Sequence, residues 1–192
     1  EIDSMQSVIK SGNFTMGKQV ASFENEFSQF IGSKYAVMSN SGSSANLLMV
    51  AALFYTKDNP LKPGDEVIVP SVSWSTTYFP LQQYGLRLRF VDIDLETLNY
   101  DLDKFSSAIT PKTRVVMVVN LLGNPNNFEA IKSAIGDNNI SLIEDNCESL
   151  GAEYKGQKTG TFGEMGSFSS FFSHHISTME GGLTVTNNDE LY

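Results

Sequence analysis

The sequence has 192 residues, of which 41% are hydrophobic and 11% aromatic, so it can bury a sizeable core and is not disordered as a whole. Its 13 lysines and arginines against 22 aspartates and glutamates give a net charge of −9. This charge argues against a general nucleic-acid-binding surface, but it still allows a local anion site built from backbone amides. The single cysteine, Cys147, cannot form an internal disulfide and cannot by itself hold zinc or an iron–sulfur cluster.

No apolar run approaches the roughly 20 residues that cross a bilayer, and no basic-then-apolar leader is present, which favours a cytoplasmic protein without membrane association. The sequence begins at Glu1 without a methionine and stops at Tyr192 just after a strand-like run. We therefore expect a fragment that is truncated at both ends. Residues 1–192 show no repeat and no linker, so we expect a single domain.

Short β-branched or apolar runs alternate along the chain with longer stretches of helical periodicity, a pattern that indicates an α/β fold. Several of the expected strands are apolar without alternation, as in strands that are buried on both faces. In chain order, the expected helices are residues 20–31, 44–55, 76–84, 102–108 and 126–135, and the expected strands are residues 35–39, 66–69, 88–92, 115–120, 141–144, 166–172 and 182–186.

A glycine–serine segment follows the first expected strand and opens the next helix: residues 39–46 read Ser-Asn-Ser-Gly-Ser-Ser-Ala-Asn. Free amides at a helix N-terminus, aided by the helix dipole, form an anion site, and Gly42 lets the backbone approach a ligand closely. The segment is neither a Walker loop nor a dinucleotide fingerprint. The alternative is an ordinary serine cap on a helix.

The strand at residues 141–144 ends in carboxylates, at the position where open α/β sheets bind ligands. Asp145 is a candidate for holding a protonated ring nitrogen, and Glu148 would lie near the same ligand. The alternative for Asp145 is a solvent-facing or helix-capping role. We interpret Cys147 as a small buried residue, because nothing nearby marks an activated thiolate.

The only two histidines, His174 and His175, lie in a loop between the last two expected strands. Adjacent histidines point in different directions, so a shared metal site is not expected without further ligands. A general base is the favoured hypothesis because imidazole titrates near neutral pH. The alternative is a structural histidine bonded to the backbone.

Four segments, residues 41–46, 70–74, 144–146 and 171–182, resemble in order the motifs of the DegT/DnrJ/EryC1/StrS family of sugar aminotransferases and dehydratases. The resemblance covers almost the entire chain. It implies the large domain of the type I aspartate aminotransferase fold, a mostly parallel sheet between helices, without the smaller C-terminal domain. It also implies a homodimer with active sites at the subunit boundary.

In the family's aminotransferases, a lysine a few residues before a Glu-Gly-Gly turn forms a Schiff base with pyridoxal phosphate. Counting back from Glu180 places His174 at that lysine's position, and imidazole cannot form this link. A branch of the family with this substitution removes the 3-hydroxyl of nucleotide-linked 4-keto-6-deoxy sugars. The resemblance therefore implies a 3-dehydratase that uses pyridoxal and pyridoxamine phosphate with glutamate as amino donor, and His174 as its base.

The resemblance also implies roles for the other site residues. Gly42, Ser43 and Ser169 would bind the cofactor phosphate and Trp74 would stack on the pyridine ring. Asp145 would pair with the ring nitrogen, and Glu148 would lie beside the cofactor. No metal is implied, and the nucleotide is expected to be GDP, in the biosynthesis of a dideoxysugar of the colitose type for the O-antigen of lipopolysaccharide.

Three alternatives remain. A CDP-sugar 3-dehydrase shares the histidine but adds a [2Fe–2S] cluster, which needs four cysteine ligands where this part of the chain has Cys147 alone. An ordinary sugar aminotransferase is disfavoured by the missing lysine at position 174. A cofactor-free binding relative is disfavoured because Asp145, Trp74 and the glycine–serine segment are all retained.

Overall fold

The computed structural model describes residues 1–192 and contains one large sheet with the strand order β1-β9-β8-β5-β4-β2-β3. Only β9 runs antiparallel to its neighbours, β1 and β8, so the expected mostly parallel sheet is confirmed. The strands are β1 (Tyr35–Ser39), β2 (Glu66–Pro70), β3 (Arg87–Val91), β4 (Thr113–Val119), β5 (Ser141–Asp145), β8 (Met165–Ser169) and β9 (Gly182–Thr186).

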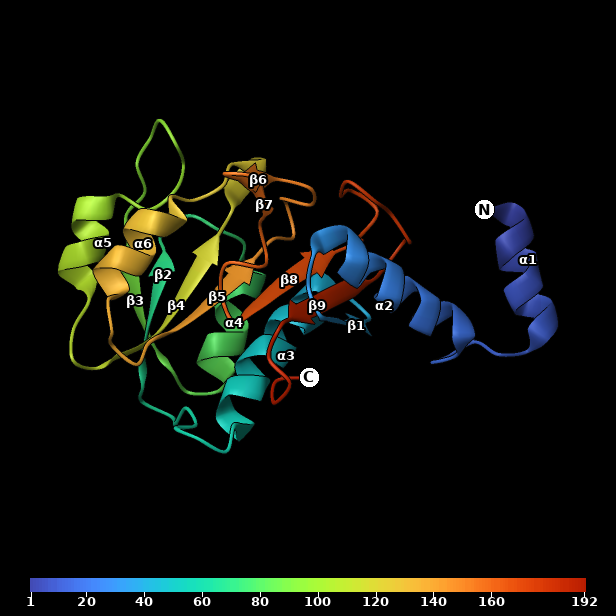
Figure 1. Cartoon of the computed structure of the whole chain (residues 1–192), viewed down its shortest axis with the longest axis horizontal. Helices are drawn as coiled ribbons and strands as arrows, with labels where there is room; N and C mark the ends of the chain where they lie inside the picture. Colours follow the sequence, from blue (N-terminus) through green and yellow to red (C-terminus); the bar gives the residue numbers. More distant parts are fainter.

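Helices cover both faces of this sheet, which gives three layers (Figure 1). One face packs against α3 (Gly42–Tyr55) and α4 (Ser75–Gln83). The other face packs against α2 (Lys18–Ile31), α5 (Leu102–Ala108) and α6 (Phe128–Ile135). The expected α/β class is therefore confirmed.

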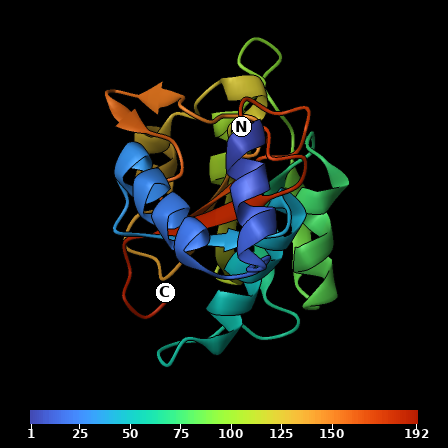
Figure 2. The same ribbon diagram turned by 90° about the vertical axis from the view of Figure 1, so that its right-hand side faces the viewer.

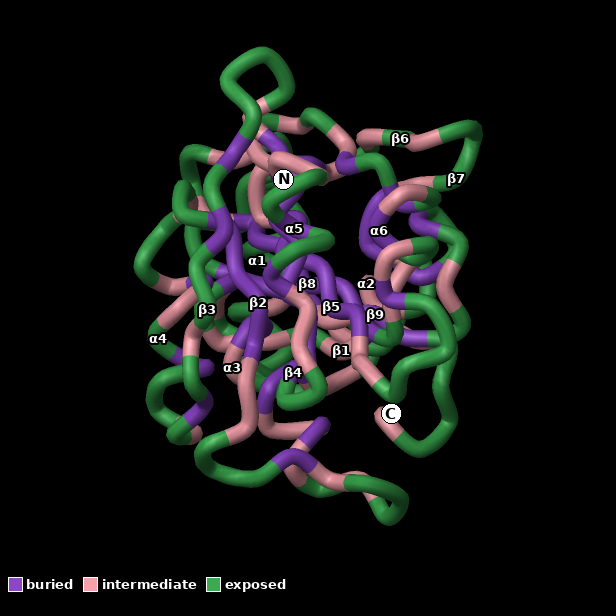
Figure 3. The backbone as a smooth tube through the Cα atoms, turned by 90° about the vertical axis from the view of Figure 1, so that its left-hand side faces the viewer, coloured by how far each residue is buried: buried purple, intermediate pink, exposed green.

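The central strands divide their apolar side chains between the two faces. In β2, Val67 and Val69 join the core under α3 and α4, whereas Ile68 joins the core under α5 and α6. All three side chains are fully buried, and Figure 3 shows buried residues along the middle of the sheet. This two-sided burial explains why the strand sequences are apolar without alternation.

Several elements differ from the sequence-based expectation. The expected strand over residues 166–172 ends at Ser169, which pairs with Gly182, and the apolar residues Phe171 and Phe172 leave the sheet. Helix α1 (Ile2–Ser11) was not expected: it buries no residue and projects away from the sheet (Figure 1), and it lies in front of the other elements when the molecule is viewed from that end (Figure 2). Three short elements were also missed: η1 (Leu121–Gly123), β6 (Glu153–Tyr154) and β7 (Gln157–Lys158). None of the helices is both long and apolar enough to span a bilayer.

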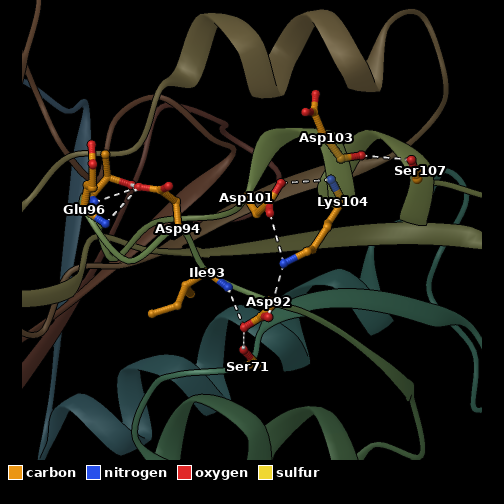
Figure 4. Close-up of polar contacts among 10 residues, drawn as sticks. Ser71, Asp92, Ile93, Asp94, Glu96, Asp101, Asp103, Lys104 and Ser107 are labelled. Atoms are coloured by element: carbon orange, nitrogen blue, oxygen red, sulfur yellow. Dashed lines mark hydrogen bonds and ion pairs between the residues drawn. The ribbon is translucent and has the colours of Figure 1, made fainter.

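The parallel strands bring their carboxyl ends to one edge of the sheet, where ligands bind in open α/β folds. At this edge a polar network ties β3 to α5 and to the segment after β2 (Figure 4). Lys104 Nζ lies 3.3 Å from Asp92 and 3.0 Å from Asp101, and Ser71 Oγ donates to Asp92 over 3.2 Å. This network anchors the short segment that leads from β2 to Trp74.

Candidate active site

A cavity of about 820 Å³ lies at the carboxyl edge of the sheet. Its lining residues come from the segments that follow β1, β2, β4, β5 and β8, and from the turn before β9. Six of the seven predicted site residues line it, whereas Asp145 is buried next to its wall. The lining residues are Ser41, Gly42, Ser43, Trp74, Thr76, Leu122, Cys147, Glu148, Ser169, Phe171, Ser173, His174, His175 and Glu180.

The N-terminus of α3 forms one wall of the cavity. Ser41 is the N-cap, and its side chain accepts the N–H of Ser44 at 3.1 Å. The amides of Gly42 and Ser43 precede the first intrahelical donor, so they remain available to an anion. A Cβ at Gly42 would lie only 2.6 Å from the Cβ of Ser169, so only glycine lets α3 approach β8 this closely.

Asp145 lies at the end of β5 and is only 5% exposed. Its Oδ2 accepts hydrogen bonds from Asn46 Nδ2 at 2.9 Å and Thr77 Oγ1 at 2.8 Å, and its Oδ1 accepts the N–H of Cys147 at 3.1 Å. All three donors are neutral, and no lysine or arginine pairs with this carboxylate. A buried carboxylate without a cation fits a positively charged ligand group such as a protonated ring nitrogen.

Sequence reasoning missed Asn46 and Thr77 as partners of Asp145. Asn46 carried a usable signal, because it is a polar amide next to the apolar run that fills the rest of the helix; the structure buries it fully. Thr77 carried none, since a threonine near the start of a helix is common.

The two carboxylates at the end of β5 have separate environments. Asp145 points toward α3 and α4, whereas Glu144 points to the opposite face and is fully buried. Glu144 accepts the N–H groups of Gly160 and Phe162, both at 2.6 Å, and of Gly163 at 2.8 Å. Glu144 therefore fastens the loop beneath the sheet and does not reach the cavity.

Trp74 and Glu148 form a bonded pair on the cavity wall. Trp74 precedes α4 and is 66% exposed, and its Nε1 donates to Glu148 Oε1 over 2.8 Å. Glu148 Oε2 accepts the N–H of Leu122 at 3.1 Å. Leu122 has a left-handed backbone with φ of 53°, which directs its amide to this carboxylate.

The loop between β8 and β9 brings both histidines to the cavity. His174 is half-buried, whereas His175 is exposed. Cys147 lines the same cavity, and burial raises the pKa of its thiol well above the usual range. This agrees with the interpretation of Cys147 as a packing residue. No group of three or more His, Cys, Asp or Glu side chains is placed to hold a metal ion.

The cavity therefore combines free helix amides, an indole face, a buried uncompensated carboxylate and an imidazole. The family model described as the DegT/DnrJ/EryC1/StrS aminotransferase family matches residues 1–192. The chain belongs to this family.

Two curated family members named GDP-4-keto-6-deoxy-D-mannose 3-dehydratase are similar to the whole chain. The protein from Yersinia pseudotuberculosis is 61% identical over 192 residues, which make up 49% of its length. The protein from Escherichia coli is 59% identical, and the match covers 50% of its length. The chain thus spans about half the length of these relatives.

Two solved structures of the family share the fold over the entire chain. The Escherichia coli GDP-4-keto-6-deoxy-D-mannose-3-dehydratase with bound hydrated PLP has a TM-score of 0.97 at 59% identity, with 49% of that chain covered. A variant of ColD, with a histidine replaced by lysine and the preceding serine by asparagine, has a TM-score of 0.98 at 58% identity, with 50% of that chain covered. These structures confirm the type I aspartate aminotransferase fold that the resemblance implied.

Proposed function

We propose that the full-length protein removes the 3-hydroxyl of GDP-4-keto-6-deoxy-D-mannose, using pyridoxal and pyridoxamine phosphate with glutamate as amino donor. The names of the two curated relatives support the reaction and the nucleotide sugar. The product fits a role in the biosynthesis of a dideoxysugar of the colitose type. The whole reaction belongs to the complete protein, to which this chain contributes the cavity described above.

The observation that carries the proposal is the presence of His174, and of no lysine, among the residues that line the cavity. A cofactor in this cavity has no amine with which to form a covalent link, so the protein must hold it by noncovalent contacts. The related variant with histidine replaced by lysine also has asparagine in place of the preceding serine. In this chain, Ser173 is the only serine that a histidine follows, which favours His174 over His175 as the matching residue.

The chemistry of the proposed binding residues supports this cofactor. The amides of Gly42 and Ser43, together with the hydroxyl of Ser169, are placed to bind its phosphate at the start of α3. The indole of Trp74 offers a face for the pyridine ring, and Asp145 supplies the negative charge that keeps the ring nitrogen protonated.

When bound, the cofactor would supply an amine that condenses with the C-4 ketone, and a ring that takes up the electron pair left by the C4′ proton and returns it as the C-3 hydroxyl leaves. His174 removes the proton from the C4′ carbon of the cofactor, for which a neutral imidazole is suited. Leu122 and Phe171, which line the same cavity, restrict the access of water to that carbon.

We also propose that the complete protein is a cytoplasmic homodimer. Large apolar side chains are exposed around the cavity, including those of Val72, Leu122, Phe172 and Met179. Exposed apolar patches mark protein interfaces, and a second subunit on this rim would complete the site. Nucleotide-linked sugars and glutamate are cytoplasmic metabolites, which supports the location.

The test is to incubate the complete protein with pyridoxal phosphate, glutamate and GDP-4-keto-6-deoxymannose, and to measure ammonia and the 3-deoxy sugar. We expect both in equal amounts, without a reductase. Formation of an amino sugar without ammonia would identify an aminotransferase, and dependence on a reductase would favour the iron–sulfur enzyme. If the protein neither binds pyridoxal phosphate nor forms product, it is a non-catalytic relative.

A further inference from the structure

The loop that carries His174 is closed at its base by a small polar cluster. Ser169 and Gly182 are the last paired residues of β8 and β9, so residues 170–181 form the loop. The N–H of Ser170 donates to the carbonyl of Gly181 over 2.9 Å, and the N–H of Thr178 donates to the carbonyl of Ser170 over 2.9 Å. These two backbone bonds join the ends of the loop.

Two hydroxyl groups complete this closure. Ser170 Oγ and Thr178 Oγ1 lie 2.7 Å apart, and Thr178 Oγ1 donates to the carbonyl of Glu180 at 2.9 Å. Because the proton of Thr178 is used in that bond, the proton between the two hydroxyls comes from Ser170. Ser170 is 1% exposed, so its hydroxyl depends on this partner rather than on water.

Gly181, the residue before β9, leaves room for this pair of hydroxyl groups. A Cβ at Gly181 would lie 2.3 Å from Ser170 Oγ and 2.7 Å from Thr178 Oγ1. Both are shorter than any contact that a real Cβ makes, so the hydroxyl pair occupies the space that a side chain at this position would need.

Beyond this base, few contacts hold the loop: the N–H of Phe171 donates to Ser169 Oγ over 3.3 Å, and the rings of Phe171 and His174 meet edge-on with centroids 6.2 Å apart. Within residues 171–177 the single bond between backbone groups runs from the N–H of His174 to the carbonyl of Phe171, at 2.9 Å. Phe172 and Ile176 are exposed. The placement of the imidazole relative to the cavity therefore depends on the base of the loop.

We propose that Ser170 and Thr178 are positioning residues that set the place of residue 174 in the active site. The proposal rests on the proposed function, in which His174 must reach one carbon of the cofactor. Neither hydroxyl lines the cavity, so both act through the loop and not through contact with substrate or cofactor.

The experiment uses a lysine at position 174 as a probe of loop position. The full-length His174→Lys protein is incubated with pyridoxal phosphate, reduced with borohydride at fixed times, and the modified peptide is quantified by mass spectrometry. Thr178→Val and Thr178→Ser are each added to this background. We expect the valine variant to lower the trapped fraction at early times about fivefold, the factor for one lost hydrogen bond, and the serine variant to restore it.

Thr186→Val is the matched control, because Thr186 Oγ1 donates to the carbonyl of Glu164 at 2.7 Å at the opposite end of β9. This variant is expected to trap the cofactor like His174→Lys alone. If Thr178→Val does not fold, as judged by its thermal unfolding, Ser170→Ala replaces it, since it removes the same bond from the other side.

Equal trapping in the valine and serine variants would overturn the positioning role and leave the proposed function intact. If His174→Lys alone traps no cofactor, the proposed function fails, and hydrogen exchange of residues 171–177 in the cofactor-free proteins decides the positioning role. Faster exchange in Thr178→Val than in Thr178→Ser supports it, and equal exchange rejects it.

Discussion

The indole Nε1 of Trp74 donates a 2.8 Å hydrogen bond to Oε1 of Glu148. Through its second oxygen, Glu148 also holds Leu122, so one carboxylate joins the segments that follow β2, β4 and β5. A large, mostly exposed ring would otherwise rotate freely about its side-chain bonds. The bond to Glu148 fixes the plane that the ring presents to the cavity.

We predict that Glu148→Ala weakens binding of pyridoxal phosphate to the full-length protein by roughly 1 kcal/mol, because Trp74 loses its fixed orientation. Glu148→Gln should have a smaller effect, since its amide oxygen can still accept one of the two N–H bonds. Acrylamide quenching of tryptophan emission, corrected with Trp74→Phe, should increase in the alanine variant. Unchanged quenching would show that Glu148 does not hold the indole.

Asp145→Asn should slow the glutamate-driven conversion of pyridoxal to pyridoxamine phosphate by about tenfold or more, while the cofactor stays bound. An amide cannot stabilise a protonated ring nitrogen as a carboxylate does, and the bonds from Asn46 and Thr77 would then meet a neutral group. The change in cofactor absorbance with time gives the rate. An unaltered rate would remove Asp145 from this role.

His174→Asn should abolish ammonia release and formation of the 3-deoxy sugar, yet leave cofactor affinity within about threefold of the parent, because the proposed phosphate and ring contacts do not involve residue 174. His175→Asn is the matched control, since His175 also lines the cavity but is more exposed. It should retain most of the activity. The opposite pattern would assign the base to His175.

Gly42→Ala should destabilise the cofactor-free protein by about 1–3 kcal/mol, the range for overpacking at a tight contact. The new methyl would meet Ser169 Cβ at 2.6 Å and Cys147 Sγ at 2.7 Å, neither of which is the end of a long flexible chain. Urea unfolding measures the change. Ser43→Ala adds no atoms and keeps the backbone amide, so it should leave stability unchanged.

Glu144 should make the free energy of unfolding fall as pH rises. Burial raises the pKa of Glu144 to about 7, although the N–H groups of Gly160, Gly163 and Phe162 oppose this. The unfolded chain ionises near the ordinary value of 4.5, so the folded state binds the extra proton between about pH 4.5 and 7. This contribution to stability is fully present below pH 4.5 and is lost as pH rises through 7.

Glu144→Gln should therefore flatten the decline in unfolding free energy between about pH 4.5 and 7. It should also lower stability by about 1–3 kcal/mol, because the amide group cannot accept all three backbone N–H bonds. Urea unfolding at closely spaced pH values measures both effects. An equally steep pH profile in the variant would mean that another group titrates in this window.

The sequence was sufficient for those parts of the site that depend on short segments. Gly42 and Ser43 were recognisable because a strand meets a helix there, and Asp145 because it ends a buried strand. What could not be predicted depends on contacts between distant segments. Asn46 and Asp145 are 99 residues apart in the chain, and the bond between them exists only because α3 packs over β8, the strand that pairs with β5.

The fold shows the same division. The strand positions followed from apolar runs, whereas the reversed direction of β9 left no local trace in residues 182–186. Helix α1 carries an amphipathic pattern, with Ile2, Met5 and Ile9 at helical spacing, which the sequence analysis overlooked; in the structure these side chains are exposed. The hydrogen bond between Ser170 and Thr178 at the base of the loop could not be predicted either, because it depends on the register of β8 and β9, which a single sequence does not contain.

The position of β9 also has a consequence for the order of folding. β1, near the start of the chain, pairs with no strand other than β9, which is among the last residues of this segment. A nascent chain that ends before residue 182 therefore leaves β1 without a partner strand and the start of α3 without Gly182, which lies against Ser41. Long-range pairings of this kind are slow to form, so the start of α3, the proposed phosphate site, should be among the last parts of the fold to mature during synthesis.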